Sequence, residues 1–215
     1  FFTGTIGIPI LLFIYKFLPS IYTELPHSEN LLFQLLGYVF QVGLCEELLK
    51  IAPVFIYIYW KKNNNEDVEP LKIVILGLFS ALGFAAFENI MYSLKFIENS
   101  AILAINYGVQ GALEGTHQAM IISIARYLST VFGHALYSGI FSYFIALTYI
   151  SGERKYALFI VGLSLSSLIH GSYDWLTSLQ PTFAGFIDVG AFILFYGYVL
   201  KLRGMIDLSN IQNKN

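Results

Sequence analysis

Long apolar stretches dominate this sequence and restrict what it can fold into. A helix needs about 20 apolar residues to cross the ~30 Å hydrocarbon core of a bilayer. Six stretches near that length, bounded by charge, run over residues 3–17, 31–60, 73–94, 127–150, 156–176 and 183–200. Only 12% of the residues are charged and 56% are hydrophobic, which excludes an ordinary soluble domain. We therefore expect one all-α domain over residues 1–215, a polytopic bundle of about six membrane helices.

The basic residues outside these stretches predict the orientation of the bundle. A further semi-apolar stretch, 101–125, holds Glu114 and His117, which we interpret as a solvated or lid pair. If this stretch does not cross, one side of the membrane carries Lys61, Lys62, Lys72, Arg154, Lys155, Lys201 and Arg203, and the other carries Lys16, Lys95 and Arg126. The positive-inside rule places the larger group, and with it both termini, in the cytoplasm. Residues 101–125 then form an outer, interfacial or re-entrant helical segment.

The rest of the composition excludes other classes of protein. A net charge of −2 offers no basic surface for nucleic acid. The one cysteine, Cys45, excludes an intramolecular disulfide, and we interpret it as a small packing residue. The chain opens at Phe1 rather than Met, so we expect a fragment or a processed form.

Eight ionisable residues lie inside the predicted spans, where even a lenient scale assigns about 2.5–3.5 kcal/mol to each. They are Glu46, Glu47, Lys50, Glu88, His134, His170, Asp174 and Asp188. Glu88, His134 and His170 fall at one level, about six residues or ~9 Å below the predicted outer ends of their helices. We expect these groups to face one another inside the bundle, with Asp188 as an interior hydrogen-bonding residue.

Helical spacing pairs several of these residues along their own helices. Glu46 and Lys50 are four residues apart and share a helix face, as are His134 and Ser138. The same spacing joins His170 to Asp174. The Asp174 carboxylate is therefore placed to accept a hydrogen bond from one nitrogen of His170, leaving the other nitrogen free.

This set of side chains can hydrolyse a peptide bond without a serine or cysteine nucleophile. Glu46 or Glu47 would take a proton from water as general base, while His134 and His170 would polarise the water or hold the oxyanion. In a second version, a divalent metal lies among Glu88, His134 and His170, with zinc favoured by the ligand types. The spacing leaves both versions open.

Buried acids and bases also build transporters and ion or proton channels, which are the main alternative. We disfavour that alternative because neither inverted repeats nor helices broken near the midplane are evident. A purely structural ion pair between Glu46 and Lys50 explains one acid and leaves Glu47 without a role.

Four motifs carry a family resemblance. They are EExxK at residues 46–50, FxxxEN at 84–89, GHAxxS at 133–138 and HGxYD at 170–174. Together, in this order, they resemble the PrsW family of intramembrane proteases. That family is more distantly similar to the CAAX prenyl endopeptidases and the bacteriocin-processing proteases, whose second motif has His where this chain has Glu88.

The resemblance implies a multi-spanning peptidase of the cell membrane that uses no cofactor or one divalent metal ion. It makes the first (site-1) cut in a membrane-anchored substrate, typically an anti-sigma factor. The ~9 Å depth of the site below the outer face predicts that this cut falls near the outer edge of a single-span substrate. By position, the resemblance assigns water activation to Glu46 and Glu47, and water or metal binding to Glu88 and His134. It assigns oxyanion stabilisation or the remaining ligand to His170 with Asp174, and supporting roles to Lys50, Asn89 and Ser138.

Overall fold

The computed structural model describes residues 2–19, 24–151 and 154–212. Every regular element in these ranges is helical, which confirms the predicted all-α class. The elements are α1 (Phe2–Thr5), α2 (Gly7–Tyr15), η1 (Leu25–His27), α4 (Leu31–Gly37), η2 (Tyr38–Gly43), α5 (Leu44–Lys50), α6 (Ala52–Asn63), α7 (Pro70–Ser151), α8 (Lys155–Leu179) and α9 (Pro181–Gln212).

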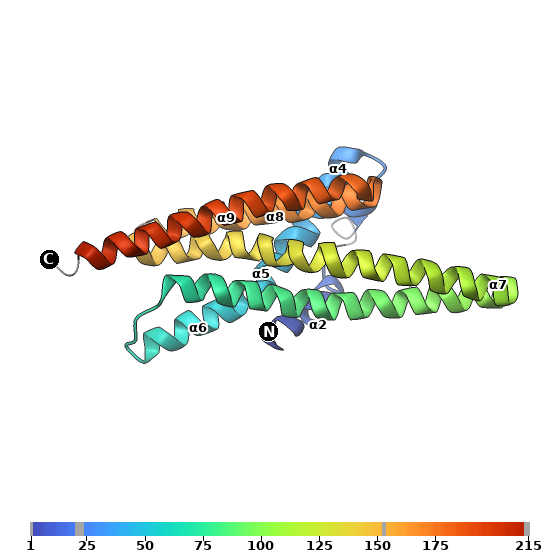
Figure 1. Cartoon of the computed structure of the whole chain (residues 1–215), viewed down its shortest axis with the longest axis horizontal. Helices are drawn as coiled ribbons and strands as arrows, with labels where there is room; N and C mark the ends of the chain where they lie inside the picture. Colours follow the sequence, from blue (N-terminus) through green and yellow to red (C-terminus); the bar gives the residue numbers. More distant parts are fainter. Residues whose placement is uncertain (1, 20–23, 152–153, 213–215) are drawn as a thin grey trace.

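The longest element, α7, is a helical hairpin rather than one straight rod. Gly108 adopts φ 61° and ψ −147°, and the chain doubles back there (Figure 1). This positive φ is strained for residues with a side chain, so a glycine suits the turn. The arms, residues 70–107 and 109–151, are ~57 Å and ~65 Å long at 1.5 Å per residue. The segment 101–125, predicted to be outer, interfacial or re-entrant, is the tip of this hairpin and projects beyond α8 and α9.

The predicted count of about six spans is not confirmed. Among the described residues, three helices are long and apolar enough to cross a membrane: α7, α8 and residues Pro181–Leu208 of α9. The arms of α7 contain the predicted spans 73–94 and 127–150. The predicted span 3–17 corresponds to the short helices α1 and α2.

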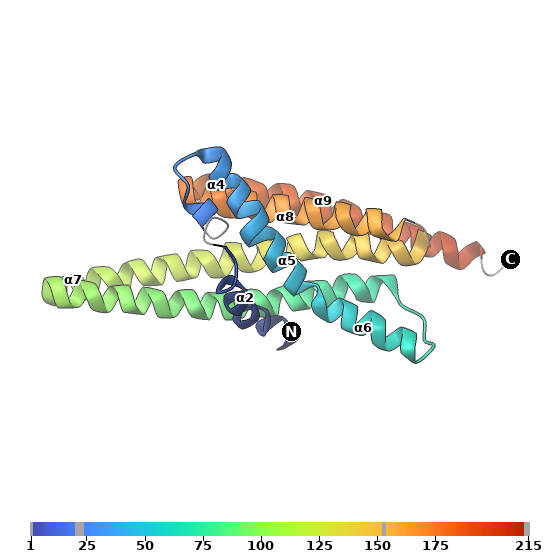
Figure 2. The same ribbon diagram turned by 180° about the vertical axis from the view of Figure 1, so that it is seen from behind.

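The predicted span 31–60 is a broken helix, of which the sequence showed no clear sign. It runs through α4, the π-helix η2, α5 and α6. The break follows Ile51, because Pro53, in the first turn of α6, has no backbone N–H to continue the hydrogen-bond ladder. A π-helix places one extra residue in a turn, and such turns are frequent at functional sites. Figure 2 shows this run crossing the face made by α7 and α8.

Glycines allow η2 and α5 to approach α8 closely. A Cβ on Gly43 would lie 2.5 Å from the carbonyl oxygen of Ser167, and one on Gly171 would lie 2.5 Å from Cα of Val39. Small residues at such crossings let helix backbones meet in membranes. Because of this contact, Glu46 and Glu47 of α5 lie beside His170 of α8.

Candidate active site

The acids of α5 surround a lysine of the same helix. The Nζ atom of Lys50 lies 3.1 Å from Oε2 of Glu46 and 2.9 Å from Oε1 of Glu47. All three side chains are buried, and those of Glu47 and Lys50 are fully closed off. The ammonium also lies 4.6 Å from the centre of the Phe84 ring. The buried ammonium of Lys50 is therefore compensated by the carboxylates of Glu46 and Glu47.

His170 of α8 faces carboxylates at both ring nitrogens. Its Nδ1 lies 3.0 Å from Oε1 of Glu47, and its Nε2 lies 3.3 Å from Oδ2 of Asp174 and 3.7 Å from Oε2 of Glu46. Asp174 thus lies where the helical spacing predicts. The second nitrogen, which the spacing left free, faces Glu47. A neutral ring can donate a proton to only one of these neighbours, whereas an imidazolium can donate on both sides.

His134, on the second arm of α7, contacts both Lys50 of α5 and Glu88 of the first arm. Its Nδ1 lies 2.6 Å from Nζ of Lys50, and its Nε2 lies 2.9 Å from Oε2 of Glu88. An ammonium can only donate, so Nδ1 accepts from Lys50 and Nε2 donates to Glu88. The rings of His134 and His170 meet edge to face with centroids 4.9 Å apart.

Arg126 is a site residue that the sequence reasoning missed. Its Nη2 lies 3.3 Å from Oε1 of Glu88, and its guanidinium lies 3.5 Å from the centre of the Tyr92 ring. In the predicted topology Arg126 is a charge outside the spans, just before the stretch 127–150. Its position eight residues before His134, about two turns along a helix, is the signal that indicates a shared face.

The supporting residues differ in what they contact. Ser138 donates a 2.6 Å hydrogen bond to Oε2 of Glu47. Asn89 is buried, and within the described part of the chain its side-chain amide has no hydrogen-bond partner. Tyr137 stacks on His170 with centroids 5.1 Å apart and donates a 2.5 Å hydrogen bond to Asp188. Asp188 therefore lies behind the site rather than in it.

The predicted pair Glu114 and His117 lies far from these residues, near the tip of the hairpin. Both residues are exposed, and Glu114 accepts a 2.6 Å hydrogen bond from Gln118. This arrangement is a solvated helix surface.

Side-chain exposure distinguishes the closed end of the site from the open one. Glu47 and Lys50 are 0% exposed, while Glu88 and Arg126 are 19% and 20% exposed and Asp174 is 25% exposed. The site is therefore open on the side of Glu88, Arg126 and Asp174.

Three side chains are spaced to hold one divalent cation. Glu46, His134 and His170 each offer a ligand atom, and these atoms lie within 4.8 Å of one another. Oε2 of Glu46 is buried without a hydrogen-bond partner among the described residues. Two imidazoles and a carboxylate suit catalytic zinc. The sequence-based ligand set has Glu88 in the place of Glu46, whereas here Glu88 contacts the ring of His134 from the side of Arg126.

Comparisons with known proteins match most of the chain. A sequence model described as the PrsW family intramembrane metalloprotease matches residues 1–201. The chain is 29% identical over 162 residues to "Protease PrsW" of Geobacillus kaustophilus (strain HTA426), covering 75% of the chain and 60% of that protein. It is 26% identical over 171 residues to "Protease PrsW" of Shouchella clausii (strain KSM-K16), covering 80% of the chain and 64% of that protein.

The corresponding protein of Bacillus subtilis (strain 168), also named "Protease PrsW", is 27% identical over 157 residues. That match covers 72% of the chain and 61% of the relative. The chain thus spans about three fifths of the length of these relatives. No solved structure matches it.

Proposed function

We propose that this chain, which belongs to the PrsW family of intramembrane metalloproteases, is an endopeptidase that cuts a single-span membrane protein. The observation that carries the proposal is the buried contact of two adjacent acids, Glu46 and Glu47, with His170. Such a group supplies a proton acceptor for water and a donor for the developing oxyanion. We propose a site-1 cut in an anti-sigma factor, near the outer side of the membrane.

Of the two acids, Glu46 faces the reacting water. Its Oε2 has no hydrogen-bond partner among the described residues, and it lies between Lys50 and His170. Glu47 is instead engaged at both oxygens, by Lys50 and His170 at Oε1 and by Ser138 at Oε2. Glu47 is therefore a positioning residue that holds the Lys50 ammonium and the His170 ring.

Each histidine has an acid behind it that sets its orientation. Glu47 contacts Nδ1 of His170, and Glu88 accepts from Nε2 of His134. Carboxylates in this position fix ring orientation and tautomer. His170, which also contacts Asp174, is placed to donate a proton to the oxyanion or to the leaving amine.

The residues present fit the metal that the family description names. Glu46, His134 and His170 would hold it as ligands, in place of the proton-transfer roles given above, and the Lys50 ammonium would have to give up its contacts with Glu46 and His134. A divalent ion held there would supply Lewis-acid activation of water and of the peptide carbonyl. Glu47 and Glu88 then orient the two imidazoles from behind.

The placement of the connections supports a cytoplasmic location for the basic end of the bundle. The α6–α7 connection, the last turn of α7, the first turn of α8 and the end of α9 lie at one end of the molecule (Figure 1). Most of the basic residues of the larger group lie in or beside these segments. We propose that this end, where the C-terminus lies, is cytoplasmic, and that the N-terminus faces the same side of the membrane.

Cleavage of a co-reconstituted substrate tests the proposed function. The substrate is a single-span anti-sigma factor with a different tag at each end, in vesicles with the wild-type protein, Glu47→Gln or His170→Ala. We expect the wild-type protein to separate the two tags and both variants to lose detectable cleavage while eluting as folded protein. Full turnover by both variants, or none by the wild type, would refute the assignment.

A further inference from the structure

Arg126 contributes buried hydrogen-bond donors that the network described above does not use. Its Nε and Nη2 are closed to solvent, and neither has a hydrogen-bond partner among the described residues. The 3.3 Å approach of Nη2 to Glu88 is an ion-pair contact. A guanidinium presents five N–H donors in a fixed fork, so donors left over after pairing one carboxylate can bind a further acceptor.

Tyr92 holds this guanidinium at the open side of the site. The Arg126 group lies 3.5 Å from the centre of the Tyr92 ring, a cation–π geometry that fixes the plane of the fork. Tyr92 is four residues after Glu88, so both project from the same face of the first arm of α7. The second arm supplies Arg126, and the three side chains together bridge the two arms beside the reaction space.

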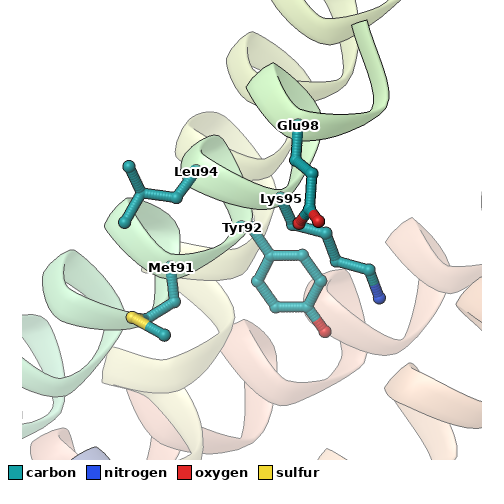
Figure 3. A pocket seen from close by; sticks show the side chains of 5 residues that line it. All are labelled: Met91, Tyr92, Leu94, Lys95 and Glu98. Atoms are coloured by element: carbon teal, nitrogen blue, oxygen red, sulfur yellow. The ribbon is translucent and has the colours of Figure 1, made fainter. Parts of the chain in front are cut away.

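A hollow of about 450 Å³ begins at the same tyrosine. It is lined by Met91, Tyr92, Leu94, Lys95 and Glu98. Figure 3 shows the Tyr92 ring and the charged ends of Lys95 and Glu98 on one side of the helix, with Met91 and Leu94 on the other. The hollow thus offers both apolar and polar side chains along the arm beyond Glu88. A peptide segment that passes from an apolar to a polar environment can contact both kinds of side chain.

We propose that Arg126 is a substrate-binding residue, and that the part of its guanidinium that is not paired with Glu88 hydrogen-bonds to a backbone carbonyl of a peptide segment that enters this hollow beside Tyr92. This inference rests on the proposed function and names the chain's own contact with its substrate. A backbone carbonyl is the acceptor that any peptide carries beside its scissile bond. Because Glu88 pairs with one part of the fork, it also keeps Arg126 aimed toward the reaction space.

The alternative role for Arg126 is to neutralise Glu88 and nothing more. A lysine at position 126 distinguishes the two roles, because it could compensate the charge of Glu88 but could not replace the guanidinium in binding substrate. A lysine ammonium at this position can still compensate the charge of Glu88, but it is a point charge without the planar fork that stacks on Tyr92. Substrate affinity and turnover must therefore be measured separately for both replacements.

The test uses the co-reconstituted anti-sigma factor with Arg126→Ala, Arg126→Lys and, as a matched control, Arg203→Ala on the exposed end of α9. Hydrogen bonds to a charged group correspond to roughly a 10–100-fold effect on binding. We expect Arg126→Ala to raise KM by that factor with a smaller change in kcat, Arg126→Lys to fail to restore KM, and Arg203→Ala to match the wild type. Tyr92→Leu should also raise KM, and Tyr92→Phe should raise it less.

Each outcome supports or refutes the inference. A wild-type KM in Arg126→Ala, or full rescue by Arg126→Lys, would show that the guanidinium only compensates Glu88 and would overturn substrate binding. Equal cleavage by the wild type, Glu47→Gln and His170→Ala would instead refute the proposed function, and the inference with it. A folded Arg126→Ala variant is identified by an elution volume and thermal unfolding temperature equal to those of Arg203→Ala.

Discussion

Nδ1 of His170 lies 3.0 Å from Oε1 of Glu47, and neither side chain is reached by solvent. The two residues come from different helices, which meet where glycines on η2 and α8 let the backbones touch. Because of this contact, the neighbouring acids Glu46 and Glu47 differ in their surroundings. Glu47 is turned toward the interior and its partners, and Glu46 keeps an oxygen without a hydrogen-bond partner.

The two acids should respond differently to neutralisation. We expect Glu46→Gln to abolish cleavage and to lower the free energy of unfolding less than Glu47→Gln does, because Glu46 contacts Lys50 and His170 through one oxygen only, whereas Glu47 is engaged at both. Glu47→Gln should abolish cleavage and also lower the free energy of unfolding by about 1–3 kcal/mol, because it weakens contacts to Lys50, His170 and Ser138. Thermal unfolding in detergent, with the cleavage assay, measures both. Substantial activity in Glu46→Gln would contradict its contact with the reacting water.

Removal of the central ammonium should destabilise the bundle. Lys50→Met leaves two buried carboxylates beside each other without a compensating charge, which typically costs about 3–5 kcal/mol. We expect a lower unfolding temperature and no cleavage. Lys201→Met, an exposed lysine on α9, is the control and should unfold like the wild type. If Lys50→Met were as stable as this control, the carboxylates would need another partner.

Close packing at Gly171 should be intolerant of a methyl group. A Cβ there would lie 2.5 Å from Cα of Val39 and 2.6 Å from its backbone nitrogen, so α8 must shift and carry the adjacent His170 with it. We expect Gly171→Ala to lose about 1–3 kcal/mol of stability and most of its activity. Gly190→Ala has no neighbouring atom within 4 Å and should be neutral or slightly stabilising. Equal unfolding temperatures for the two variants would refute the close η2–α8 contact.

Metal binding should follow the three ligand atoms. We expect purified protein to bind about one zinc ion, a chelator to stop cleavage, and added zinc to restore it. Glu46→Gln should abolish stoichiometric binding, whereas Glu88→Gln should weaken it by about 10–100-fold, as loss of an orienting carboxylate does. Glu114→Gln, on the exposed hairpin tip, is the control for both assays. Full activity in protein shown to lack metal would exclude the zinc-dependent mechanism. The mechanism in which a glutamate activates water without a metal would then remain.

The membrane orientation can be tested with single cysteines. In a Cys45→Ala background, cysteines at Asn64 and Ser178 should react with an impermeant reagent from opposite sides. Asn64 follows α6, Ser178 lies in the last turn of α8, and the two segments lie at opposite ends of the bundle (Figure 1). The proposal places Asn64 on the cytoplasmic side. Labelling of both residues from one side would overturn this topology.

Contacts within one helix were predictable because helical periodicity alone places side chains four residues apart on one face. The ion pair of Glu46 with Lys50 and the contact of His170 with Asp174 follow this rule. The gathering of Glu88, His134 and His170 was expected from their common depth. The break after Ile51 was missed, because a single proline among apolar residues changes the apolar pattern very little.

The sequence by itself determined that this chain is an all-helical membrane protein with acids, histidines and a lysine in its interior, because charges within apolar helices must face one another. Only the tertiary structure decided which atoms meet. The pairing of Lys50 with His134 depends on how α5 packs against the hairpin, and that of Arg126 with Glu88 depends on the alignment of its arms. The relative height and rotation of separate helices come from backbone packing at residues such as Gly43 and Gly171, and no local pattern encodes them.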